Sequence, residues 1–217
     1  MIKEYINKLR SLQDGKLCTW KTPKLIYQFV TRFLSERIGK IRAQSIPTFK
    51  EKQKENYYHR IAKKEELNQI LAIYSSLFND SVEEKHIKSL YSLFPNLFFV
   101  LVFNDKVVGY QIFKILPAIH LRSKPHFMWE IWLFSIAITR EHQGKGLGRW
   151  SLKNAMQFFK KHGPEKMKLL VDHSNQIAIN LYQDLGFMSD VNSKKSSESK
   201  IVMSINLWEM EISKFSN

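Results

Sequence analysis

Apolar positions recur along this chain with two different periods, and the switches between them predict its elements. Residues 64–77 and 82–94 carry apolar side chains at helical spacing, whereas residues 57–61 read as a short strand. Residues 97–103 and 106–115 are strand-like runs on either side of Asn104-Asp105, a pair that favours a tight turn. The middle of the chain is therefore predicted to hold a strand, two helices and a hairpin.

The second half alternates strands with helices more regularly. Strands are expected at 128–138, 167–172, 186–190 and 201–211, and helices at 147–161 and 175–185. Two stretches read as loops: residues 117–127, and the Ser- and Lys-rich residues 192–200. No internal repeat interrupts this order.

The N-terminal region has a different pattern. Residues 1–12 have helical spacing, and a second helix is expected over residues 22–38, with Thr22 as its cap and Pro23 in its first turn. Residues 43–56 are polar. The expected organisation is a basic helical extension (1–42), a linker (43–56) and one domain (57–217).

Charge separates the extension from the domain. The net charge is +14, and residues 1–60 hold 14 Lys and Arg against 5 Asp and Glu. Such an excess suits nucleic acid, an anionic surface or an acidic partner, but it equally serves solubility. The two N-terminal helices are expected either to dock on the domain or to form a basic binding surface.

Other features restrict the class of protein. The lone Cys18 allows no intrachain disulfide, and no apolar run is long enough to span a membrane. The first residues lack a secretory pattern, so a cytoplasmic setting is expected. The seven histidines show no zinc-ligand spacing, so no metal is expected.

The most informative stretch precedes the helix at 147–161. It places three glycines at alternate positions in a tight strand-to-helix turn: Gln143-Gly144-Lys145-Gly146-Leu147-Gly148. Backbone N–H groups at a helix N-terminus attract anions, and glycines allow close approach, so a phosphate group is the expected ligand. The stretch matches neither the Walker pattern nor the dinucleotide-binding pattern.

Two blocks together resemble the GCN5-related N-acetyltransferases. The first is the stretch above, similar to that family's Q/R-x-x-G-x-G/A acetyl-CoA loop. The second, about thirty residues downstream, is similar to its N-x-x-A-x-x-L-Y-x-x-x-G-F segment and runs from Asn175 to Phe187. The resemblance covers roughly residues 57–210. It implies an α/β (α+β) fold with a mixed, mostly antiparallel sheet and helices on both faces, in which two central strands splay around the acyl-CoA arm.

The resemblance also implies how acetyl-CoA would be held. Backbone N–H groups of the loop would bind the pyrophosphate, with added charge from Lys145 and Arg149, and the strand edge at Ile136, Ala137 and Ile138 would pair with the pantetheine arm. The expected cofactor-contacting residues are Ile136, Ala137, Ile138, Gln143, Gly144, Lys145, Gly146, Leu147, Gly148, Arg149 and Asn175.

Two side chains are candidates for proton transfer. Tyr182 fills the tyrosine position of the second block and could protonate the leaving thiolate, although a core role beside Ile179 and Leu185 is the alternative. Glu130 lies in an apolar strand, where a carboxylate must be paired, solvated or neutral. It precedes Gln143 by 13 positions (143 minus 130), as the base glutamate does in histone-acetylating members of the family. The alternative is a structural ion pair with Lys or Arg.

Further positions bear on the choice of base. His120, His126, Asp172 and His173 are weaker candidates. Members that acetylate ribosomal protein N-termini often carry Glu in an L-E-V run, but here that run is Leu169-Leu170-Val171. The absence of a carboxylate at Leu170 favours Glu130.

The expected function is direct transfer of an acetyl group from acetyl-CoA to a primary amine. The acceptor is a small molecule, a protein lysine or an N-terminus, and the chain is a monomer or a homodimer. The alternative is a non-catalytic acyl-CoA-binding or nucleic-acid-binding module of the same fold.

Overall fold

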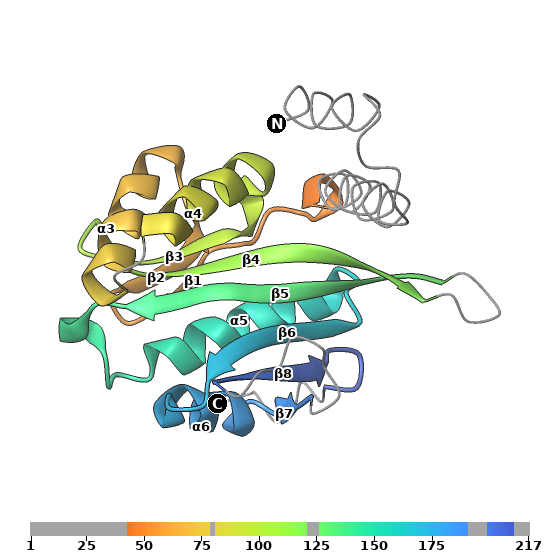
Figure 1. The fold of residues 1–217 in the computed structure, drawn as a ribbon. Helices are drawn as coiled ribbons and strands as arrows, with labels where there is room; N and C mark the ends of the chain where they lie inside the picture. The colour runs from red at the N-terminus through yellow and green to blue at the C-terminus, as the bar shows by residue number, and fades with distance from the viewer. Residues whose placement is uncertain (1–42, 79–80, 121–125, 191–198, 211–217) are drawn as a thin grey trace, which may run out of the picture. The chain divides into compact units, whose positions relative to one another are not determined.

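A computed structural model describes residues 43–78, 81–120, 126–190 and 199–210. Their centre is an eight-stranded sheet in the order β1-β2-β3-β4-β5-β6-β8-β7 (Figure 1). Neighbouring strands are antiparallel except β5 and β6, which are parallel. The strands are β1 (Lys52–Lys54), β2 (Tyr57–Ile61), β3 (Phe98–Phe103), β4 (Lys106–His120), β5 (His126–Ile138), β6 (Lys166–Asp172), β7 (Met188–Ser189) and β8 (Lys200–Asn206).

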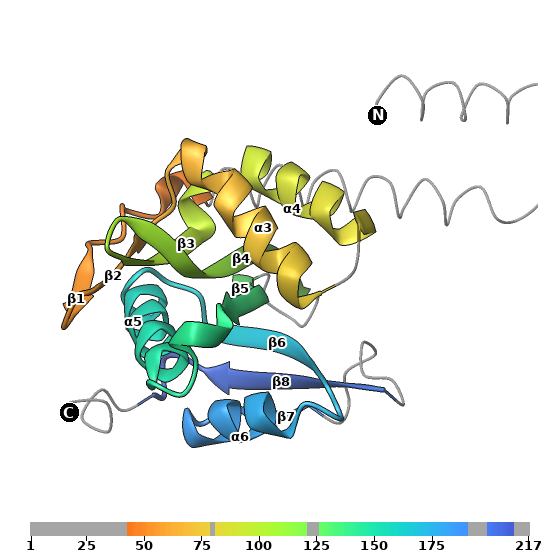
Figure 2. The same cartoon turned by 90° about the vertical axis from the view of Figure 1, so that its left-hand side faces the viewer.

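Helices cover both faces of this sheet. Helices α3 (Leu67–Leu77) and α4 (Ser81–Leu93) lie on one face, and α5 (Leu147–Lys161) and α6 (Gln176–Asp184) lie on the other (Figures 1 and 2). Three single turns of 3₁₀ helix complete the order: η1 (Lys64–Glu66), η2 (Pro95–Leu97) and η3 (Arg140–His142). The expected fold class, a mixed and mostly antiparallel sheet between helices, is confirmed.

Helix α5 has the most regular amphipathic pattern. Leu152, Ala155, Met156 and Phe159 are fully buried and recur at intervals of three and four residues, so one stripe of the helix meets the sheet. The Phe159 ring packs against Phe113 of β4 with centroids 4.9 Å apart. This packing holds the C-terminal half of α5 against the sheet, and the helix begins at the glycine-rich turn that follows β5.

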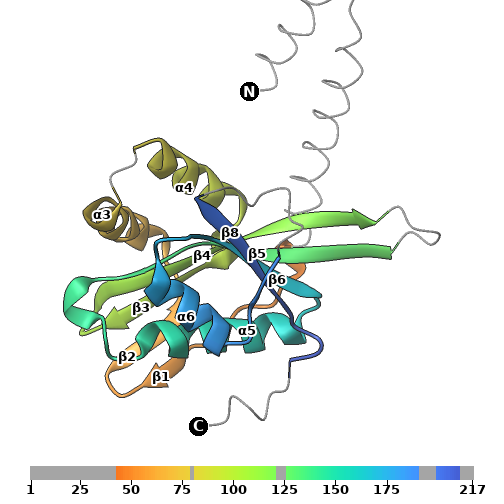
Figure 3. The same ribbon diagram turned by 60° about the horizontal axis from the view of Figure 1, so that its bottom comes forward.

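The predicted hairpin is present between β3 and β4. Asn104 and Asp105 both have positive φ, 47° and 60°, which is the conformation that a two-residue hairpin loop requires. The other predicted loop, residues 117–127, is shorter than expected. Strand β4 continues to His120 and β5 begins at His126, so the two form a long paired arm beyond the rest of the sheet (Figure 3). Pro117 did not end the strand.

The polar stretch 43–56 contributes to the folded unit. Its apolar members Ala43, Ile46 and Phe49 are buried in the main core, and Lys52–Lys54 forms the edge strand β1. Sparse apolar residues among charged ones gave no periodic signal, although each is buried. The last strand ends at Asn206, earlier than the predicted 211. The predicted N-terminal helices and most of the 192–200 loop lie outside the described residues.

Candidate acyl-CoA and acetyl-transfer site

The glycine-rich turn forms the junction between β5 and α5. Gly146 is the N-cap residue of α5 and has the left-handed conformation (φ 70°, ψ 7°), and Gly144 has φ 73°. These angles favour glycine, which explains two of the three alternating glycines. The Gln143 side chain donates from Nε2 to the Ile138 carbonyl at 2.8 Å, which ties the turn to the end of the strand.

The first turn of α5 offers free donors. Its first helical bond runs from Trp150 N–H to the Gly146 carbonyl at 3.0 Å, so the N–H groups of Leu147, Gly148 and Arg149 have no partner within the helix. Among the described residues, no side chain caps this end of the helix. Aligned N–H groups and the positive end of the helix dipole therefore form an anion site.

Basic side chains flank this turn on the side of β1 and β2. Lys145 Nζ lies 3.4 Å from Tyr57 Oη, and Tyr57 Oη lies 2.9 Å from His142 Nδ1. Lys54 Nζ lies 3.9 Å from the point that a Cβ on Gly146 would occupy. A hollow of about 290 Å³ is lined by Lys54, Tyr57 and Lys145, together with Glu55, Asn56, Phe103 and Leu147. Burial, and then the charge of Lys145, lower the pKa of His142.

Arg149 lies differently from Lys145. Its guanidinium forms an exposed ion pair with Asp184 of α6. Part of its charge is therefore already compensated, whereas among the described residues Lys145 has no carboxylate partner. Of the two cations expected to assist the loop, Lys145 is the more available to an anion.

The strand edge expected to hold the pantetheine arm is open. Strand β6 pairs with β5 only from Glu130 to Leu133. Beyond this point Phe134 forms a bulge, because Ile112 faces Ser135 while Phe113 faces Leu133. Ser135–Ile138 then pairs with β4 alone among the described strands, so its other edge keeps free backbone donors and acceptors.

Close packing holds that edge in place. A Cβ on Gly109 of β4 would lie 2.8 Å from the carbonyl oxygen of Ala137. Glycine thus lets the two strands approach at the level of the predicted cofactor-contacting residues. Ile136 and Ile138 are half-buried and Ala137 is buried.

Tyr182 is buried on α6, with 6% of its surface exposed. Its ring packs near Phe187 with centroids 5.8 Å apart. Among the described residues its hydroxyl has no hydrogen-bond partner. Burial raises the pKa of Tyr182 to about 12, so the phenol is protonated at neutral pH.

Asn175 caps the helix that carries Tyr182. Its Oδ1 accepts a hydrogen bond from Ala178 N–H at 3.1 Å. The Oδ1 atom is therefore engaged in capping the helix. The Nδ2 group remains available for another contact.

Glu130 forms an ion pair across the parallel junction. Its Oε1 accepts from Lys168 Nζ of β6 at 2.9 Å, and both side chains are less than a fifth exposed. Lys168 also lies 3.8 Å from Asp190 Oδ2. The ion pair offsets the cost of burying the carboxylate. This is the structural ion pair given above as the alternative to a catalytic role. An ion-paired carboxylate is compatible with a catalytic role as well as with a structural one.

Some of these partners were not identified from the sequence. Lys168 is one of the polar residues that alternate with buried ones along β6, but alternation alone does not single it out. Tyr57 and Lys54 lie about ninety positions before Lys145, and only the pairing of β2 with β3 brings them near the turn. Of the weaker base candidates, Asp172 accepts hydrogen bonds from Ser174, which lower its pKa.

Known proteins share both the sequence pattern and the fold. The model of the acetyltransferase (GNAT) family matches residues 67–187. N-acetyltransferase family 8 member 2 of Rattus norvegicus is 27% identical over 79 residues, which cover 36% of this chain and 35% of the relative. The [ribosomal protein bS18]-alanine N-acetyltransferase of Escherichia coli K12 is 41% identical over 58 residues, which cover 27% of this chain and 39% of the relative.

A solved structure gives the same fold. Arabidopsis thaliana NAA60, solved in complex with acetyl-CoA, superposes with a TM-score of 0.56 at 12% identity and covers 69% of this chain and 99% of its own. The family match spans more than half of the chain, which therefore belongs to the GNAT acetyltransferase family. The chain aligns with less than half of the length of the curated relatives.

Membrane-spanning helices and metal-ligand clusters are both absent from the described residues. None of their helices is both long and apolar enough to cross a membrane. In the same part of the chain, no three His, Cys, Asp or Glu side chains are grouped so as to hold a metal ion.

Proposed function

We propose that this protein is an N-acetyltransferase that transfers an acetyl group from acetyl-CoA directly to a primary amine. The observation that carries the proposal is the uncapped N-terminus of α5, with left-handed Gly146, beside an open β5 edge. An anion site and an unpaired strand edge side by side suit a ligand that has a pyrophosphate and an amide-containing arm. The membership of the family and the acetyl-CoA in the NAA60 structure support the same ligand.

The chain's own groups fit acetyl-CoA. The N–H groups of residues 144–149 would bind the pyrophosphate, with Lys145 and Lys54 adding positive charge. Ile136, Ala137 and Ile138 would offer backbone donors and acceptors to the pantetheine amides. A backbone N–H of this edge would also polarise the thioester carbonyl. When bound, acetyl-CoA supplies an activated acetyl group.

Tyr182 would act as the general acid. Its hydroxyl is protonated and has no partner among the described residues, so it is free to donate to a departing thiolate. The Asn175 cap and the packing of Phe187 would hold α6, and hence the phenol, in position.

Glu130 would act as the general base for the amine. The carboxylate is held at the first paired position of β5 and β6, on the strand that leads to the open edge after Leu133. Lys168 would position it, and the positive charge of Lys168 would offset the cost of burying a carboxylate. Direct transfer needs no covalent intermediate, so no side chain is proposed to act as a nucleophile.

The acceptor is a small amine or a protein amine. The matched relatives include an enzyme named for the alanine of ribosomal protein bS18. Leu170, which stands where such enzymes often carry Glu, is 43% exposed on β6. An apolar side chain there would favour an acceptor with an apolar group beside its amine.

Mass spectrometry of candidate acceptors tests the proposal. Peptides with free N-termini, lysine-containing peptides and polyamines would each be incubated with acetyl-CoA and the protein. The proposal predicts one added acetyl group on an amine, together with release of CoA. Acetyl-CoA binding without transfer to any acceptor would instead favour a non-catalytic acyl-CoA-binding module.

A further inference from the structure

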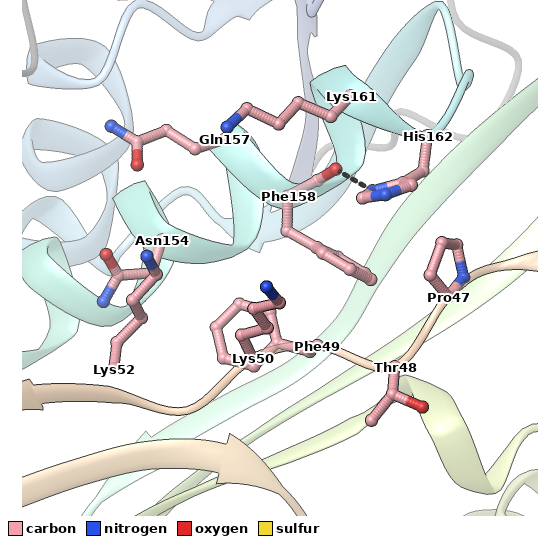
Figure 4. Close-up of a pocket in the computed structure, with 10 residues that line it drawn as sticks. All are labelled: Pro47, Thr48, Phe49, Lys50, Lys52, Asn154, Gln157, Phe158, Lys161 and His162. Carbon is pink, nitrogen blue, oxygen red and sulfur yellow. Dashed lines mark hydrogen bonds between the residues drawn. The ribbon is translucent and has the colours of Figure 1, made fainter.

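A second pocket lies away from the glycine-rich turn. It has a volume of about 300 Å³ and lies between residues 47–52 and the C-terminal half of α5 (Figure 4). Asn154, Phe158 and Lys161 line it from the helix at spacings of four and three residues, so they share one face. At 1.5 Å per residue, Phe158 lies about 16 Å along the helix from Leu147. The pocket is therefore separate from the proposed acetyl-CoA site.

The pocket is positively charged. Lys50 and Lys52 line it from the extended segment, and Lys161 lines it from α5 (Figure 4). Glu51 lies between the two lysines but reaches Arg60 at 3.8 Å. No Asp or Glu lines the pocket, and among the described residues none forms an ion pair with these three lysines. The site suits an anion.

An aromatic surface underlies this charge. Phe158 is half-buried, and its ring meets Phe49 edge-on with centroids 5.2 Å apart. The His162 ring lies 4.5 Å from that of Phe158, held by a 2.6 Å contact between His162 Nδ1 and the Phe158 carbonyl. A flat ring beside several cations is the combination that binds nucleotides.

One polar group at the pocket lacks a partner. The Nδ2 atom of Asn154 is buried, and it has no hydrogen-bond partner among the described residues. Such a donor is unfavourable unless a ligand oxygen accepts from it. It lies on the same side of the pocket as Lys52 (Figure 4).

We propose that this pocket binds a nucleoside monophosphate. Its base would stack on Phe158, and its phosphate would accept hydrogen bonds from Lys50, Lys52, Lys161 and the Asn154 amide. The volume is at the lower end of the range for small-molecule sites, which fits one nucleotide better than a dinucleotide. The proposal does not depend on acetyl transfer.

Calorimetric titration with AMP tests this site. We expect one AMP to bind per chain. Lys50→Glu/Lys161→Glu should weaken binding by about tenfold or more, because it removes two charge-assisted contacts. Lys85→Glu/Lys88→Glu on α4 is the matched control, since both of its lysines are exposed and the change in net charge is the same. The control should bind AMP as the wild type does.

Two further variants test the role of the aromatic ring and the independence of this pocket from the acetyl-CoA site. Phe158→Leu should weaken AMP binding but leave binding of inorganic phosphate unchanged, because only the base needs the ring. Gly146→Asp, designed to disable the acetyl-CoA site, should keep full AMP binding. The proposal is overturned if AMP does not bind, if both double variants bind it equally, or if the Gly146→Asp variant loses it.

Discussion

Lys168 Nζ and Glu130 Oε1 lie 2.9 Å apart across the parallel pair β5–β6. Glu130 faces Lys166 in that register, four positions before the Phe134 bulge separates the strands. The carboxylate is therefore fixed at the first residue pair of β5 and β6, before the opening that is expected to receive the acyl group. The position and the ion pair of Glu130 allow a test of whether this residue acts in catalysis or only stabilises the structure.

Glu130→Gln should lower kcat by about 10²–10⁴-fold, the usual range for loss of a general base. It should leave acetyl-CoA affinity nearly unchanged, because the amide keeps the shape of the side chain. Steady-state kinetics and calorimetry measure the two quantities. Lys168→Met is the control, since it breaks the same ion pair but leaves the carboxylate. A purely structural role for Glu130 would make both variants equally active.

Tyr182→Phe should also lower kcat by about 10²–10⁴-fold, because it removes the proposed acid. The hydroxyl has no partner among the described residues, so its loss should change the free energy of unfolding by less than about 1 kcal/mol. Urea unfolding and kinetics on the same preparation measure both effects. Full turnover by a stable Tyr182→Phe variant would assign Tyr182 to the core alone.

Buried His59 should make stability depend on pH. Neither of its ring nitrogens has a hydrogen-bond partner among the described residues, and burial lowers its pKa to about 3. The nearby Gln111 side chain opposes the shift, but its Nε2 donates to Ser151 at 2.8 Å and it makes no hydrogen bond to the ring. Below pH of about 6.5 the unfolded chain takes up a proton that the folded chain does not.

Stability should therefore fall as the pH falls from about 6.5 towards 3. By pH 5 the loss from His59 should be about 2 kcal/mol. Urea titrations at pH 7 and pH 5 should show this loss in the wild type and in His173→Gln, whose histidine is exposed. It should be absent in His59→Phe, which fits among Phe49, Phe99 and Trp150. An equal loss in all three proteins would exclude His59 as the cause.

The sequence predicted the elements of the sheet because their apolar patterns are long and regular. Helix α5 begins and ends at the predicted residues, 147 and 161. The turn at Asn104-Asp105 was predicted from two residues whose chemistry tolerates positive φ. Local rules sufficed in these places.

Other features depend on contacts between distant segments. The burial of Phe49 in a polar stretch and the continuation of β4 past Pro117 depend on neighbours that a local window does not contain. The same holds for the site. The glycine turn is a local signal, whereas the pairing of Glu130 with Lys168 requires β5 and β6 to be adjacent. The sequence could name Glu130 and the alternative of an ion pair, but not its partner.

Calorimetric titration with acetyl-CoA tests the central claim, that the N-terminus of α5 binds its pyrophosphate. Wild type should be compared with Gly146→Ala and Gly146→Asp. Both variants place a side chain at a residue with φ of 70°, which costs about 1–2 kcal/mol for Ala and less for Asp, since Asp tolerates positive φ. Only Asp also places a negative charge at the anion site. The account predicts binding by the wild type, weaker binding by the Ala variant and at least a further tenfold loss for the Asp variant. Equal affinities of the Ala and Asp variants, or no binding by folded wild-type protein, would contradict it.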